Sequence, residues 1–227
     1  MRKIVSLVAL SAFLGGCATI SGFQTGKTID KNTGQMGVSV GGGRTVFRTY
    51  LSGFDLDLPS VSMEIGGGYG ITDQIDISLK YAVPITLGGT VRYGFLNEKR
   101  GAPVSVAVGV GVSYWSVSSS SGATKSIATS TDLSGILFVS RDLAEAVTLY
   151  ITPRYVSRMA KNSREQTGFT TAEESLTTPM IGGGIGVMFN LGQARDKHLA
   201  LEYNKVQWTE DSAYYSTQYG LALTFGI

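Results

Sequence analysis

The sequence predicts an all-β fold: a closed antiparallel barrel of about ten strands that crosses a membrane and follows a cleaved N-terminal signal peptide. Three observations carry this prediction. From about residue 34 onward, apolar residues alternate with small or polar ones, which is the period of a strand. No apolar run reaches the ~20 residues that a spanning helix requires. In the clearest strands, the residues on the second face are small, as the crowded interior of a narrow barrel requires.

The chain begins with a short secretory signal. Arg2 and Lys3 precede an apolar run over residues 4–13, which is too short to span a bilayer as a mature helix. The run ends in Leu-Gly-Gly-Cys at residues 14–17, which resembles the lipobox of bacterial lipoproteins. The resemblance implies cleavage before Cys17, a diacylglyceryl thioether on its sulfur, and an acyl chain such as palmitate on its new amino group. An ordinary signal peptide with a chance cysteine is the alternative.

Composition describes a folded mature chain without net charge. The signal peptide holds two of the 19 basic side chains, so the mature chain has 17 basic and 17 acidic ones. This balance excludes nucleic-acid binders, which need a basic surplus to displace counterions from phosphates. Cys17 is the only cysteine, so its lipidation leaves no internal disulfide. The predicted domains are the signal peptide (1–16), a lipidated tether (17–33) and the barrel (34–227).

Residues 104–114 show the alternation most clearly. Every second residue from Val104 to Tyr114 is Val or Tyr, and the residues between them are Ser, Ala or Gly. A soluble, lipid-tethered barrel of lipocalin type would hide its apolar face inside and show polar side chains to water. Here the second face is too small and too weakly polar to solvate a sheet. The pattern therefore favours the membrane barrel.

The same pattern predicts ten strands along the chain. Each is near the ~9–11 residues of a tilted membrane strand; they cover 35–48, 60–71, 75–83, 85–96, 104–116, 131–140, 147–157, 178–190, 198–206 and 214–227. The sixth strand is the exception, because Ile136 and Phe138 share the parity of Asp132 and Ser134. A bulge, or a strand that does not face lipid throughout, would explain it.

The links between strands are predicted to alternate in length, with short turns on the periplasmic side and long loops at the surface. The short links are expected at 72–74, 97–103, 141–146 and 191–197, and the long ones at 49–59, 117–130, 158–177 and 207–213. Only the link around Pro84 is too short for its side. An even number of strands returns the C-terminus to the periplasmic side, where the lipid anchor is expected.

Two segments carry a family resemblance. Residues 68–77 resemble the turn-flanking hairpins of small bacterial outer-membrane β-barrels. The end of the chain, with Tyr219, Leu221, Leu223 and Phe225 at alternate positions, resembles the C-terminal strand that the barrel-assembly machinery recognises. The chain departs from that pattern by ending in Ile227 instead of an aromatic residue. The resemblance implies an outer-membrane barrel and no particular activity.

The inward parity places three acidic and three basic side chains in the lumen. Unpaired charges would be costly in so narrow an interior, so we expect paired charges that fill the barrel, and the lining of a small pore is the alternative. The six residues are Glu64, Asp76, Lys80, Arg92, Arg154 and Glu202. On the outward parity, tyrosines near strand ends are typical of interfacial girdles: Tyr81, Tyr93, Tyr114, Tyr155 and Tyr203.

Other motifs favour structural roles. Residues 22–28 resemble a P-loop but have three instead of four residues between the glycines, so 18–33 is predicted to be a tether. His198 is the only histidine and has no obvious nucleophile beside it. Asp55 and Asp57 are weak grounds for a cation site, and no metal or cofactor is predicted. Trp208 is expected in a loop.

The expected function is therefore that of a non-enzymatic outer-membrane lipoprotein with a largely filled lumen and a structural or surface-binding role through the loops 117–130 and 158–177. A narrow channel is the second candidate and a lipid-modifying barrel enzyme the third. Ala18 follows the cysteine where an Asp would signal inner-membrane retention in enteric-type sorting. The expected partners are outer-membrane lipids and the barrel-assembly and lipoprotein-sorting machineries, with no nucleic acid and an unidentified surface ligand.

Overall fold

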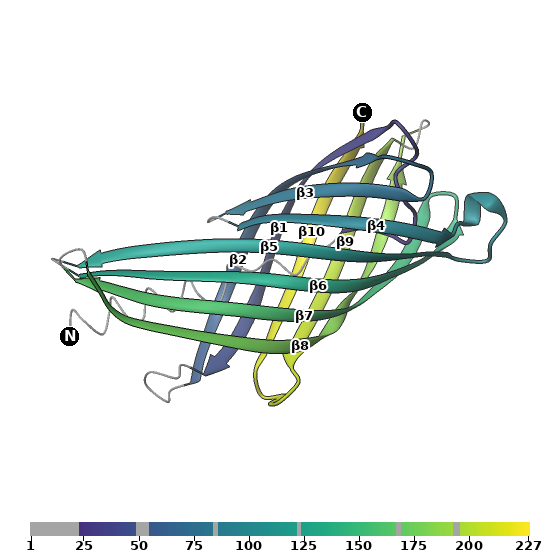
Figure 1. Cartoon of the computed structure of the whole chain (residues 1–227). Coiled ribbons are helices and arrows are strands. Elements are labelled where there is room, and N and C mark those ends of the chain that lie inside the picture. The colour runs from purple at the N-terminus through teal and green to yellow at the C-terminus, as the bar shows by residue number, and fades with distance from the viewer. Residues whose placement is uncertain (1–22, 49–54, 84–85, 122–123, 167–168, 193–195) are drawn as a thin grey trace.

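Ten antiparallel strands form one closed barrel (Figure 1). The computed structural model describes residues 23–48, 55–83, 86–121, 124–166, 169–192 and 196–227. Each strand pairs with its neighbours in the chain, and β1 closes the barrel against β10. The predicted fold class is confirmed. In the described part of the chain no helix is long and apolar enough to cross a membrane, a finding that concerns helices alone.

The strand bounds agree with the predicted ones at most ends. The strands are β1 (Gly34–Arg48), β2 (Asp55–Gly70), β3 (Ile75–Val83), β4 (Thr86–Leu96), β5 (Ser105–Ser121), β6 (Thr124–Ala144), β7 (Val147–Gln166), β8 (Phe169–Leu191), β9 (Lys197–Trp208) and β10 (Tyr215–Gly226). One short 3-10 helix, η1 (Glu98–Arg100), lies in the link between β4 and β5. Asp55 and Asp57, expected on a loop, belong to β2 instead.

The alternation places apolar side chains outside and small or polar ones inside. In β5, Val108, Val110 and Val112 are exposed, whereas Ser105, Ala107 and Gly109 on the other parity are buried. The five tyrosines predicted as girdles are all on the outer face. A barrel that exposes its apolar residues to its surroundings and buries its polar ones is the inverse of a soluble one, and it matches a lipid environment.

The sixth predicted strand keeps a regular register through the questioned positions. The register of β6 against both β5 and β7 is the same on either side of Ile136 and Phe138, so no bulge lies there. Phe138 instead points into the lumen, where it is fully buried, and the Arg92 guanidinium lies 5.2 Å from its ring centroid. An aromatic ring fills the barrel at this height, which is why the parity of β6 is mixed.

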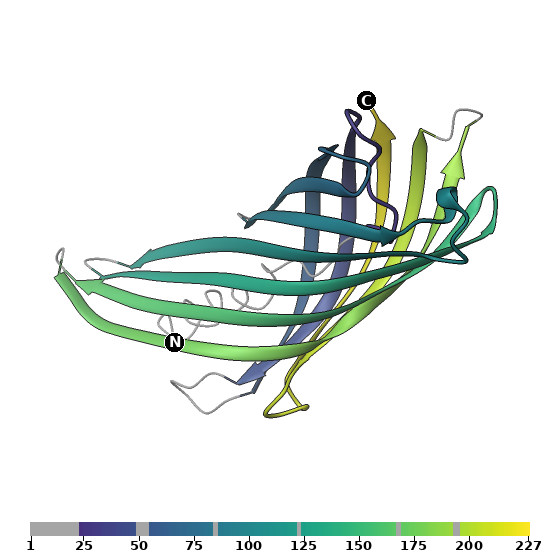
Figure 2. The same ribbon diagram turned by 45° about the vertical axis from the view of Figure 1, so that its right-hand side comes forward.

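The predicted loops 117–130 and 158–177 are wrong as loops, because they extend strands. Strands β5, β6, β7 and β8 have 17, 21, 20 and 23 residues, about twice the length that crosses a membrane. They project together as a sheet far beyond β3 and β4 (Figures 1 and 2). We call the part beyond the barrel, residues 117–121, 124–128, 160–166 and 169–176, the extended sheet. Its Thr residues are β-branched, which favours strands, although the segment carries no apolar stripe.

The two ends of the barrel chain lie together. Gly34 and Ile227 exchange two backbone hydrogen bonds, each 2.9 Å from nitrogen to oxygen. Because consecutive strands are antiparallel, every second link lies at this same end of the barrel. These are the links from β2 to β3, β4 to β5, β6 to β7 and β8 to β9. We call it the turn end, and the opposite end, toward which the extended sheet projects, the sheet end.

Candidate functional site: the barrel lumen

The structure places all six predicted luminal charges on the inner face of the barrel. Asp76 is fully buried, and Arg92 and Glu202 are 3% and 4% exposed. Glu64 and Arg154 are buried as well, and Lys80 is partly buried. Charges withdrawn from water in this way need partners, and their effect on the stability of the barrel depends on how well they are paired.

Asp76 and Arg92 form the best-defined pair. They face each other in register on β3 and β4. Arg92 donates from Nε to Asp76 Oδ1 at 2.8 Å and from a terminal nitrogen to Oδ2 at 2.6 Å, which is the two-pronged geometry of a strong arginine–carboxylate pair. Phe138 lies against the guanidinium and keeps water from that side.

A second cluster lies on β7 and β9. Arg154 donates to Thr152 Oγ1 at 3.0 Å and to Asn204 Oδ1 at 3.1 Å. The Asn204 amide in turn donates to Glu202 Oε1, so Asn204 bridges the base and the acid. Across the barrel, Lys80 Nζ lies 3.9 Å from Glu64 Oε2. The lumen is thus lined by acidic and basic side chains from several strands.

A pair that the sequence interpretation missed lies nearer the sheet end. Arg158 donates to both carboxylate oxygens of Asp132, at 2.8 and 2.7 Å. The sequence pattern predicts a loop over 158–177, and a loop residue such as Arg158 has no inward or outward parity. The register of β6 and β7 places the two residues opposite each other. In the sequence, Asp132 and Ser134 share the inward parity, and this pattern indicates that the Asp132 carboxylate faces the lumen.

Trp208 also differs from its prediction. It ends β9, and it packs on the buried Val156, Met180 and Val206 inside the barrel. Its ring lies 5.2 Å from that of Tyr214. This apolar cluster fills the lumen near the sheet end of β9.

The greatest departure from the sequence interpretation concerns the predicted tether. Of residues 17–33, the structure describes 23–33, and residues 23–29 run inside the barrel. The Phe23 amide donates to Glu202 Oε2 at 2.8 Å, and the Ile29 amide donates to Asp76 Oδ2 at 2.8 Å. The Phe23 ring packs on an inner cluster that includes Tyr150 and Met188. We call residues 23–29 the luminal segment.

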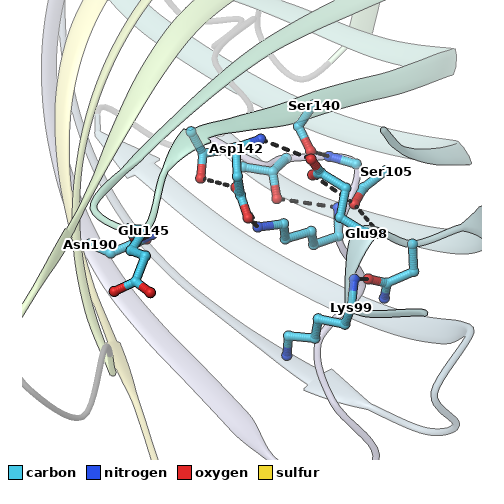
Figure 3. A network of polar contacts seen from close by, with 12 residues as sticks. Glu98, Lys99, Ser105, Ser140, Asp142, Glu145 and Asn190 are labelled. Atoms are coloured by element: carbon cyan, nitrogen blue, oxygen red, sulfur yellow. Dashed lines mark hydrogen bonds and ion pairs between the residues drawn. The ribbon is translucent and has the colours of Figure 1, made fainter. Parts of the chain in front are cut away.

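Polar contacts fasten the luminal segment at the turn end (Figure 3). Lys27 Nζ lies 2.5 Å from an Asp142 carboxylate oxygen, and Asp142 also accepts from Thr148 Oγ1 at 2.6 Å. The Gly26 amide donates to Ser140 Oγ at 3.0 Å. Glu98, in the link after β4, accepts from the Asp142 amide at 3.0 Å. The residues whose sequence resembles a P-loop thus make contacts with the barrel wall.

A cavity remains inside the barrel beside the luminal segment. Its volume is about 160 Å³. Its lining includes Phe23, Gln24 and Ile29 of the segment together with luminal side chains such as Glu64 and Lys80. A space of this size is large enough to hold water molecules.

The single histidine lies near the ends of β8 and β9. His198 lies on β9 with its Nδ1 2.9 Å from Asn190 Oδ1, at the turn end. Within the described ranges, no three His, Cys, Asp or Glu side chains gather in a way that could hold a metal ion. Cys17 lies outside the described residues.

Comparisons with known proteins agree with the fold. The profile of a family described as a membrane bound beta barrel domain (DUF5777) matches residues 19–226. That match covers nearly the whole chain. No curated protein matches the chain.

Solved barrels resemble the chain only distantly. The attachment invasion locus protein Ail of Yersinia pestis is 12% identical over 87% of this chain and 99% of its own, with a TM-score of 0.42. The outer membrane protease OmpT of Escherichia coli is 10% identical over 89% and 98%, with a TM-score of 0.47. An outer membrane channel from Pseudomonas putida is 9% identical over 88% and 97%, with a TM-score of 0.44. At these values the likeness carries no argument about function.

Proposed function

We propose, from the premise that this chain belongs to the family of membrane-bound β-barrel domains whose profile it matches, that it is a non-enzymatic, lipid-anchored outer-membrane barrel. In this proposal the lumen is closed, and the protein acts at the cell surface through its extended sheet. The chain is a barrel of the small outer-membrane type, and its role is the part that we propose.

One observation carries the proposal: the chain fills its lumen and lengthens its wall at one end. Inside, charge pairs such as Asp76–Arg92 and the luminal segment occupy the lumen beside a cavity of about 160 Å³. Outside, β5 to β8 continue well past the length that a membrane crossing needs. A closed lumen provides no route for solutes, whereas a projecting four-stranded sheet provides a surface for contacts.

The orientation of the extended sheet is open to a direct test. An epitope tag inserted between β5 and β6, or between β7 and β8, should be accessible to antibody on intact cells. The matched control is the same tag between β6 and β7, at the turn end, which should be accessible only after the outer membrane is permeabilised. The opposite pattern would place the extended sheet in the periplasm and end the surface role.

Lipidation has its own test. Cys17→Ala should abolish incorporation of labelled palmitate, because the sulfur that carries the diacylglyceryl group is gone. The barrel should remain in the membrane fraction after carbonate extraction, because its strands hold it there independently of the anchor. Persistence of the label would contradict the lipobox, and release into the soluble fraction would favour a tethered soluble protein.

A narrow channel is the second candidate, and the cavity beside the luminal segment is the observation that favours it. Its lining contains both acidic and basic side chains, including Glu64, Asp132 and Arg154. A water-filled passage along these groups would carry small ions. Conductance in planar bilayers separates this candidate from the closed barrel. A lipid-modifying enzyme stays third, because His198 lies at the turn end beside Asn190.

A further inference from the structure

We propose that residues 23–29 are a built-in plug: the barrel wall is a binding site for this stretch of its own chain, and the segment is what closes the lumen. The inference rests on the proposed closed barrel and names the part that closes it. A tether that merely collapses into the barrel would make few specific contacts. The luminal segment makes contacts of two independent kinds, polar and steric.

The polar contacts go to the main chain of the segment. Three backbone amides, those of Phe23, Gly26 and Ile29, donate to the side chains of Glu202, Ser140 and Asp76 at 2.8 to 3.0 Å. The Thr25 carbonyl accepts from Arg92 at 2.9 Å. Four different strands supply these partners, so the segment is held from several sides. Backbone groups taken out of water need such partners.

The luminal charge pairs therefore have a second task. Asp76 and Arg92 bind each other and also hold an amide and a carbonyl of the segment. Glu202 receives both the Asn204 amide and the Phe23 amide. These charges make an electrically balanced wall that presents both acceptors and donors, which is the chemistry that binds an extended peptide backbone.

The wall also lacks side chains where the segment passes. A Cβ added to Gly220 would lie 2.7 Å from Phe23 Cζ, one added to Gly94 would lie 2.9 Å from Thr28 Cγ2, and one added to Gly68 would lie 2.6 Å from Ile29 Cδ1. Real Cβ atoms essentially never show contacts this short, so a larger residue at any of these positions would force the facing side chain of the segment to shift. Glycines on three different strands thus make room for the segment.

The segment is shaped for the wall in return. A Cβ on Gly26 would lie 2.2 Å from the Ser105 carbonyl oxygen, so only glycine fits there. The next residue, Lys27, reaches Asp142 at the turn end. This ion pair is partly exposed, with 22% and 36% of the two side chains accessible, so it positions the segment more than it stabilises it.

The location of the plug can be tested by disulfide trapping. The Cβ that a side chain at Gly94 would carry lies 3.7 Å from Thr28 Cβ, close to the ~3.8 Å found in disulfides. In a Cys17→Ala background, the pair Thr28→Cys and Gly94→Cys should therefore cross-link under mild oxidation. Thr28→Cys with Phe95→Cys is the control, because Phe95 faces outward and 46% of it is exposed. Equal cross-linking of both pairs, or of neither, would overturn the proposal.

The closing role needs a second experiment. Residues 23–29 are replaced in the full chain by Gly and Ser residues of the same number, and heat-modifiable migration confirms that the barrel still folds. This variant should show steady single-channel openings that the wild type lacks. A synthetic peptide with the sequence of residues 23–29, added on the side of the turn end, should block them, and a scrambled peptide should not.

The outcomes separate this inference from the proposed function. A folded replacement variant that stays silent would overturn the plug but leave the closed barrel standing. Blocking by both peptides alike would overturn the claim of a specific binding site. Openings from the wild type would instead contradict the closed barrel itself.

Discussion

Arg92→Ala is expected to lower the free energy of unfolding by about 3–5 kcal/mol, because it leaves the carboxylate of Asp76 buried without its partner. Asp76 is fully buried and receives both prongs of the guanidinium. The change also removes the donor to the Thr25 carbonyl and the cation over Phe138. Urea titration in detergent micelles, followed by heat-modifiable migration, measures the loss.

The control for Arg92 is Arg100→Ala. Arg100 lies 3.6 Å from Asp73 at the turn end, where half or more of each side chain is exposed, so its removal should change stability by about 0–1 kcal/mol. The double change Arg92→Ala with Asp76→Ala should recover part of the loss, since no charge is then left unpaired. Equal, small effects of Arg92→Ala and Arg100→Ala would mean that water reaches Asp76, as in an open pore. In such a pore Arg92→Ala should change ion selectivity instead.

Val110→Arg should destabilise the barrel by about 2–4 kcal/mol, the cost of an arginine on the lipid face at mid-membrane. Val110 is 68% exposed on the outer face of β5. It pairs with Val91, which lies in the middle of the membrane-length strand β4. The free energy of unfolding in lipid vesicles is the measurement.

Leu143→Arg is the matched control for Val110. Leu143 is 61% exposed on β6, one residue from the end of the strand. At the edge of the membrane the same substitution should cost about 0–1 kcal/mol. A soluble barrel predicts no difference between the two sites, because water surrounds both. A neutral Val110→Arg would therefore contradict the membrane barrel.

The alternation made the strands and the luminal charges predictable. Where one face is apolar and the other small, as in β5, parity alone assigns each residue to the inside or the outside. Asp76 and Arg92 could be placed in the lumen on this basis, although their mutual pairing depends on the register between β3 and β4. That register is a tertiary property.

The extended sheet and the luminal segment were not predictable in this way. Residues 117–130 and 158–177 carry no apolar stripe outside the membrane, so their Ser and Thr content suggested loops, whereas the pairing of β5 to β8 makes them strands. The luminal segment has no strand period. Its partners, such as Ser140 and Glu202, lie 114 and 179 residues away from Gly26 and Phe23 in the chain. Contacts at such separations leave no local pattern.

The most direct test of the closed barrel is single-channel recording of the purified wild-type protein in planar bilayers. The account predicts silence at all moderate voltages, because the luminal segment and the charge pairs lie across the barrel interior. Steady openings of uniform conductance from the wild type would contradict it and make the protein a channel.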